Sequence, residues 1–253
     1  MAQRKPKKNA LLIGINYTGT DNELNGCIND TESLKIKLKE LKFDNINILT
    51  DNNPIKPTKD NILLHLQKLL VESNEGDTLF FSYSGNGSSK IDRSGDETDG
   101  LDELLISCDL NGISDDLLKY VIKKYIKKNV TLYALFDCCH SGTIVDLKYQ
   151  YFDSANYNNF TINEKVEEFD NHIIIICGCM DNQTSADAFI NKKYQGAMTW
   201  AFLEACKTPN INLNNLLINM RILLKKNNYS QIPQMSSNKK VDINKNCFLK
   251  KIY

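Results

Sequence analysis

The sequence lacks several features that would place it in a broad functional class. Its longest apolar run, residues 173–177, is far too short to span a bilayer. Positive and negative residues balance at 31 each, so the chain has no net positive charge with which to bind nucleic acid generally. The basic start, MAQRKPKKNA, has no apolar core of the kind found in signal peptides. We therefore expect a soluble, cytoplasmic protein that binds neither nucleic acid nor membranes.

Signatures of nucleotide and zinc binding are missing as well. Neither G-x-G-x-x-G nor G-x-x-x-x-G-K-[ST] follows the first apolar segment, which disfavours a nucleotide-binding domain. The eight cysteines include two close pairs, 138/139 and 177/179, and neither has C-x-x-C spacing. Without a signal peptide, free thiols in a reducing compartment are a better interpretation than disulfides.

Apolar segments alternate with segments of helical periodicity along most of the chain. This order predicts an α/β fold with a mainly parallel central sheet and helices on both faces. Thr58 and Ser114 are suited to begin helices as N-caps. A last strand is expected within residues 239–251. The predicted strands span residues 9–17, 45–50, 77–84, 129–137 and 172–179, and the predicted helices span 30–42, 58–73, 114–128, 197–206 and 213–227.

One domain is expected, spanning residues 9–253 after a basic tail of residues 1–8. A larger region, 9–146, and a smaller one, 172–253, carry the regular patterns. The stretch between them, 147–171, is polar and acidic and has no clean periodicity. We interpret it as a linker or surface loop.

Polar residues gather where three predicted strands end. The sequences are SGNG from residue 84, DCCHSGT from residue 137 and DNQTSAD from residue 181. Ligands of open parallel sheets bind beyond the carboxyl ends of the strands, so we expect one site there. In DCCHSGT, a cysteine followed by free backbone N–H groups can serve as a thiolate nucleophile beside an oxyanion hole. Judged from these residues alone, a buried structural cysteine pair is the commoner role.

The longer motifs in which this segment lies, and their order along the chain, favour the catalytic interpretation instead. Together they resemble the metacaspases, which are caspase-like cysteine peptidases of clan CD, over residues 9 to about 237. The resemblance implies a caspase–hemoglobinase fold and a monomer. The motifs are NALLIGINY, LNGCIND, DTLFFSYSGNG, GDETDGLDELLISCD, ISDD, LFDCCHSGT, GCMDNQTSADA, GAMTWAFLEA and IPQMSS.

The resemblance assigns the catalytic positions. It makes Cys139 the nucleophile, and it places the catalytic histidine between two glycines, where this chain has Asn86. An amide can neither exchange a proton nor carry the charge that stabilises a thiolate. His65 and His172 are poorly placed to substitute, and His140 adjoins the nucleophile. We expect the loss to cost several orders of magnitude in rate.

The resemblance also implies a pocket for a basic side chain. Family members cleave peptides after Arg or Lys, and the matching pocket residues here are Asp30, Asp137 and Ser84. Two carboxylates suit a guanidinium, which can be bound through both of its edges. Asp30 could alternatively cap a helix.

Calcium activation is a further implication. The matching aspartates are Asp102, Asp115, Asp116 and Asp146, whose hard oxygens suit Ca²⁺. The acidic run at 92–103 is not an EF-hand, because Glu97 stands where glycine is required. A solvated loop is the alternative for that run, and helix-stabilising first-turn acids are the alternative for Asp115 and Asp116.

Two interpretations of Asn86 follow. In one, the chain is an endopeptidase whose native histidine has been replaced. In the other, it is a natural pseudoprotease that binds basic peptides or a partner protease without cleavage. Many metacaspases cut themselves after Lys or Arg, and the resemblance makes Lys148 and Lys165 candidate sites here. The sequence has no Pro/Gln-rich or zinc-finger segment before its first strand.

Overall fold

The computed structural model describes residues 4–91, 101–138, 145, 147–151, 160–168, 170–178, 187–190 and 192–249. Its centre is an eight-stranded sheet in which the first five strands are parallel and the last three alternate in direction. The predicted α/β class is therefore confirmed. The strand order is β2 (Asn45–Thr50), β1 (Lys8–Gly14), β3 (Thr78–Ser84), β7 (Thr131–Asp137), β10 (His172–Cys177), β13 (Gln234–Ser237), β8 (Tyr149–Tyr151) and β9 (Thr161–Ile162).

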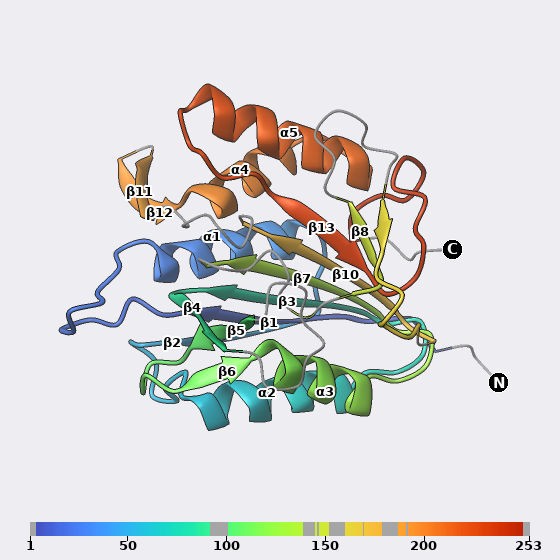
Figure 1. Cartoon of the computed structure of the whole chain (residues 1–253), viewed down its shortest axis with the longest axis horizontal. Helices are drawn as coiled ribbons and strands as arrows, with labels where there is room; N and C mark the ends of the chain where they lie inside the picture. The colour runs from blue at the N-terminus through green and yellow to red at the C-terminus, as the bar shows by residue number, and fades with distance from the viewer. Residues whose placement is uncertain are drawn as a thin grey trace.

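Helices cover both faces of this sheet (Figure 1). One layer contains α1 (Cys27–Glu40), α4 (Ala197–Ala205) and α5 (Leu213–Lys226), and the other contains α2 (Lys59–Val71) and α3 (Asp115–Tyr125). Strands β3 and β7 are buried along their whole length, as expected for central parallel strands. Neighbouring residues of β3 face opposite layers, so Phe80 joins the cluster under α1, α4 and α5, and Phe81 joins the cluster under α2 and α3.

Two of the predicted helix starts are confirmed. Thr58 Oγ1 accepts a hydrogen bond from Asn61 N, and Ser114 Oγ accepts one from Leu117 N, both at 3.3 Å. The capping alternative for Asp30 is wrong. Helix α1 begins at Cys27, with Gly26 as its N-cap, so Asp30 lies in the first turn and is completely buried.

The predicted linker and last strand are corrected by the structure. Part of the expected linker forms β8 and β9, which extend the sheet at one edge. Residues 152–159 and 169 of that stretch lie outside the described residues. The last strand of the described residues is β13, which comes before the predicted 239–251, because Gln234–Ser237 pairs between β10 and β8. Short polar segments of this kind become strands through their neighbours rather than through their own pattern.

Two small sheets lie near the carboxyl ends of the parallel strands, and neither was predicted. One contains β4 (Gly87–Ile91), β5 (Leu101–Ile106) and β6 (Gly112–Ser114), and the other is the hairpin of β11 (Asp187–Ile190) and β12 (Lys193–Gly196). Figure 1 shows both at the left end of the sheet, opposite the two termini. Within the described ranges, no helix is both long and apolar enough to cross a membrane.

Candidate active site

Two buried carboxylates meet at the amino end of α4. Asp30 comes from α1 and Asp137 ends β7, and the two residues are 0% and 4% exposed. A Cβ atom built on Gly196 would lie 2.9 Å from Asp30 Oδ2 and 2.1 Å from Asp137 Oδ2. Both carboxylates therefore flank one point, and only a glycine leaves room between them.

Neutral donors hold both carboxylates in place. Ser84 Oγ donates to Asp30 Oδ2 at 2.6 Å, and Gly196 N donates to Asp30 Oδ1 at 2.9 Å. Thr199 donates to Asp137 Oδ2 through its N–H at 2.9 Å and through its hydroxyl at 2.8 Å. Gly196 is the N-cap of α4 and Thr199 lies in its first turn. The N–H groups at a helix start have no acceptor within the helix, and together with the helix dipole they favour negative charge there.

This arrangement suits a cationic ligand. Two neighbouring carboxylates in a buried position repel each other, and a positive group between them reduces the free energy of the ionised state. The structure brings together the three predicted residues Asp30, Asp137 and Ser84. It adds Gly196 and Thr199, which the sequence interpretation missed. Their signal in the sequence is a glycine before a helix and a hydroxyl residue in its first turn.

Asn86 lies in the turn between β3 and β4. Its side-chain Nδ2 donates to the carbonyl oxygen of Asn22 at 3.1 Å. Its backbone N–H donates to the hydroxyl of Tyr17 at 2.9 Å, and its carbonyl accepts from the hydroxyl of Tyr83 at 2.8 Å. Both the backbone and the side chain at this position are therefore fixed.

The two tyrosines that fix the turn form a buried pair. Their hydroxyl oxygens are 2.9 Å apart, and both also contact the carbonyl of Ile106 on β5. Burial raises the pKa of both phenols, so both remain neutral hydrogen-bonding groups. A Cβ on Gly85 would lie within 2.8 Å of both hydroxyls, so the turn needs glycine beside the pair. The sequence interpretation missed this pair.

The predicted nucleophile, Cys139, and its neighbour His140 lie outside the described residues. The described strand that leads to them is joined to the Asn86 turn, because Ser84 pairs with Asp137 and Gly85 N donates to the carbonyl of Asp137 at 3.3 Å.

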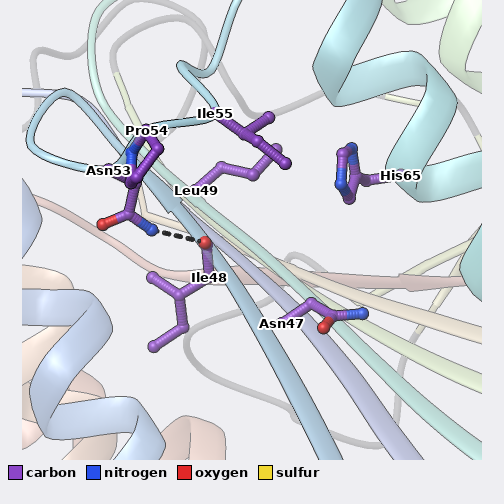
Figure 2. Close-up of a pocket in the computed structure, with 7 residues that line it drawn as sticks. All are labelled: Asn47, Ile48, Leu49, Asn53, Pro54, Ile55 and His65. Atoms are coloured by element: carbon purple, nitrogen blue, oxygen red, sulfur yellow. Dashed lines mark hydrogen bonds between the residues drawn. The ribbon is translucent and has the colours of Figure 1, made fainter.

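The described histidines lie elsewhere. His172 is the first residue of β10, at the opposite end of the sheet from Asp137. His65 belongs to α2, and its Nδ1 lies 2.8 Å from the carbonyl of Asn61. Figure 2 shows His65 across a shallow pocket of about 280 Å³ beside the edge strand β2. Neither side chain stands beside the two carboxylates, in agreement with the sequence interpretation.

The predicted calcium ligands that the structure describes have other roles. Asp102, on β5, forms an ion pair with Lys90 Nζ at 3.0 Å. Asp115 and Asp116 lie in the first turn of α3, where a helix dipole favours acids. Asp146 and residues 92–100 are outside the described part of the chain. In the part that is described, no three His, Cys, Asp or Glu side chains gather to hold a metal ion.

Comparison with known proteins identifies a family. Residues 8–148 match the family model described as "Metacaspase, peptidase C14 domain". Metacaspase-1 of Debaryomyces hansenii is 35% identical, with 94% of this chain and 66% of the relative covered. Metacaspase-1 of Candida albicans is 36% identical, with the same coverage of 94% and 66%. The chain thus spans about two thirds of the length of these relatives.

Solved structures show the same fold. Protein GSU0716 from Geobacter sulfurreducens superposes with a TM-score of 0.72 at 23% identity, covering 98% of this chain and 100% of the other. Caspase-1 from Spodoptera frugiperda gives a TM-score of 0.59 at 12% identity, covering 92% and 86%. At these identities the likeness concerns the fold, which is caspase-like as the sequence motifs implied.

Proposed function

The chain belongs to the metacaspase family, and on that premise we propose that it is a cysteine endopeptidase scaffold that selects Arg or Lys before the cleaved bond. The observation that carries the proposal is the meeting of Asp30 and Asp137 at Gly196. A guanidinium that reaches both carboxylates gains two charge-assisted partners, which a neutral side chain does not. Ser84 supports the pocket by holding the Asp30 carboxylate.

The proposed chemistry begins at Cys139. A thiolate attacks the scissile carbonyl, and the proton lost by the thiol must later reach the leaving amine. A histidine at position 86 would accept and return that proton. Asn86 cannot do so. We therefore propose that the chain with Asn86 does not cleave peptides, while its pocket still binds a basic side chain.

A binding role without cleavage is the second candidate. It is favoured by the Asn86 side chain, whose amide Nδ2 donates a hydrogen bond to the carbonyl oxygen of Asn22 and so takes part in the structure of this turn. In that role the protein would capture basic peptides or a partner protease through Asp30 and Asp137.

Calcium activation by Asp102, Asp115, Asp116 and Asp146 is included in the proposal as a switch outside the chemical step. It is supported by the pairing of β5 with β6, in which Leu104 lies opposite Ser114, the residue before Asp115. This register brings the strand of Asp102 beside the start of α3. Binding of Ca²⁺ at Asp102 would displace Lys90 from its ion pair.

We also propose that the protein is a monomer in a reducing, cytoplasmic compartment. Cys108, Cys206 and Cys247 carry free thiols, and burial raises the pKa of Cys206 to about 12, which keeps that thiol protonated and unreactive. Size-exclusion chromatography with light scattering measures the mass, and a value near twice 28.8 kDa would contradict the monomer.

The deciding experiment measures cleavage of fluorogenic peptides that end in Arg, Lys or Asp. Three forms are compared, with millimolar calcium or with chelator: the chain itself, Asn86→His, and Asn86→His/Cys139→Ala. We expect cleavage after Arg and Lys only in Asn86→His, and only with calcium. Cys139-dependent cleavage by the unmodified chain would contradict the silent state. No cleavage by Asn86→His would favour the binding role.

Self-processing is proposed for the Asn86→His form. The carbonyl of Lys148 accepts a hydrogen bond from Asn163 N at 2.8 Å, and the residue leads directly into β8. Lys165 is exposed in a turn after β9, so its peptide bond is easier to extend into a cleft. Mass spectrometry after incubation with calcium should find a break after Lys165, and this break should disappear in Asn86→His/Lys165→Ala.

A further inference from the structure

The β11–β12 hairpin carries an aromatic pair that nothing in the described structure covers. Phe189 is 64% exposed and Tyr194 is 45% exposed, and their ring centroids are 5.1 Å apart at an interplanar angle of 61°. The pair is in cross-strand register, with Phe189 opposite Tyr194. Two adjoining exposed rings on one short hairpin form an apolar surface of the kind that marks contact sites.

The register relates this pair to the carboxylates. Successive residues of a strand face opposite sides, so Tyr194 and Gly196 face one side and Gln195 faces the other. The opposite pair of Ala188 and Gln195 is buried, at 8% and 3% exposed, which fixes the outward side of the hairpin. Gly196, where Asp30 and Asp137 converge, and the two rings therefore share one side of the hairpin, about 7 Å apart along the strand.

The hairpin is tied to the pocket and is not an independent flap. Asn29 Nδ2 donates to the carbonyl of Tyr194 at 2.8 Å, and Lys193 Nζ donates to Ser33 Oγ at 2.8 Å. Gly196 N donates to Asp30. These three contacts join β12 to α1, so the strand that carries Tyr194 is held in place relative to Asp30.

We propose that Phe189 and Tyr194 form a second specificity subsite that takes an apolar side chain of the peptide whose basic side chain lies between Asp30 and Asp137. This inference rests on the proposed function. In an extended peptide, residues two apart face the same side about 7 Å apart, which matches the spacing of the two sites. Because the predicted nucleophile follows β7 in the chain, the carbonyl of the basic residue is placed toward the end of β7 and the amino-terminal side of the peptide along the hairpin. The apolar residue is therefore the second one before the basic residue.

The charge at the tip of the hairpin disfavours a second basic residue at this subsite. Lys192 is exposed there, whereas Lys193 faces the other side of the strand and donates to Ser33 Oγ. A cation at the subsite would meet the charge of Lys192, whereas a phenyl or isobutyl group would only bury apolar area.

The test measures binding to the chain as it stands, which needs no catalysis. Fluorescence anisotropy gives the Kd of three labelled peptide amides: Phe-Ala-Arg, Gly-Ala-Arg and Phe-Ala-Gln. They are compared on the unmodified chain, on Phe189→Ser/Tyr194→Ser, and on Ile222→Ser, a control that removes from α5 an apolar residue whose exposed fraction, 57%, lies between those of the two rings. Phe-Ala-Arg should bind the unmodified chain and the control about tenfold more tightly than Gly-Ala-Arg, and the double variant should lose this preference.

The outcomes separate the subsite from the basic pocket. If Arg is preferred over Gln but Phe gives no gain over Gly, or if the double variant keeps that gain, the aromatic subsite is refuted and the basic pocket stands. If Gln replaces Arg without loss, the proposed function fails while a ring-dependent gain from Phe still supports the aromatic surface. Absence of binding by every peptide overturns both.

Discussion

Substitution of Gly196 by alanine tests the geometry on which the proposed function depends. The added Cβ would lie 2.1 Å from Asp137 Oδ2, 2.8 Å from Asp137 Cγ and 2.9 Å from Asp30 Oδ2. These separations are shorter than van der Waals contact, so at least one carboxylate must move. The backbone of Gly196 has φ −65° and ψ 131°, which alanine adopts without strain, so the effect is purely steric.

The cost can be worked from the bonds at risk. Movement of Asp137 breaks its contacts with Thr199, and movement of Asp30 breaks those with Ser84 and Gly196. A hydrogen bond to a charged group contributes about 1.5–3 kcal/mol. Loss of one such bond should lower the melting temperature by roughly 3–12 °C for a chain of this size. Displacement of either carboxylate would also disturb the proposed pocket for a guanidinium, so we expect at least a tenfold weaker Kd for Arg peptides.

Gly178→Ala is the matched control, because its Cβ approaches the same carboxylate from another side. That Cβ would lie 3.4 Å from Asp137 Oδ1 and 3.3 Å from Met198 Cβ, which needs shifts of only a few tenths of an ångström. Calorimetry and peptide titration should therefore show a clearly smaller change than in Gly196→Ala. Equal melting temperatures and equal Arg-peptide affinities for the two variants would refute the convergence of Asp30 and Asp137 at Gly196.

Three further predictions concern the catalytic turn, pH and calcium. In the Asn86→His background, Tyr83→Phe removes the hydroxyl that holds the turn, so kcat should fall about tenfold while KM stays unchanged. A tenfold fall corresponds to the free energy of roughly one hydrogen bond. An equal rise in KM would contradict a positioning role. Burial opposes the ionisation of Asp77, but hydrogen bonds from Arg4 and the backbone outweigh it and lower its pKa below 3.8. The stability that ionised Asp77 provides is complete above pH 3.8 and is lost as the pH falls through the lower pKa of the folded state. In urea titrations, Asp77→Asn should therefore be less stable than the unmodified chain at pH 7 and should differ little from it near pH 2. A stability difference that does not depend on pH would disprove this linkage. Chelation should abolish cleavage by Asn86→His, and Asp102→Asn should raise the calcium concentration needed for half activity; an unchanged calcium requirement would remove Asp102 from the ligand set.

The sequence by itself determined the class of fold and the family. Four of the five parallel strands, all but β2, are mostly buried apolar runs, and helices α2 and α3 have the side-chain caps Thr58 and Ser114, so the local sequence preferences agree with the final structure. The motifs around Cys139 and Asn86 also identify their strand ends from the letters alone. These features depend on residues that are close together in the chain, within one helix or strand, so they can be recognised in the sequence.

Only the tertiary structure decided how the candidate site is assembled. Gly196 and Asp30 are 166 positions apart in the chain, and no local pattern states that one fits against the other. The donors of Thr199, the tyrosine pair beneath Asn86 and the ring pair of the β11–β12 hairpin arise in the same way. The short strands β8 and β13 are set by pairing with their neighbours rather than by composition. Contacts between distant segments depend on packing in three dimensions, which periodicity along the chain does not encode.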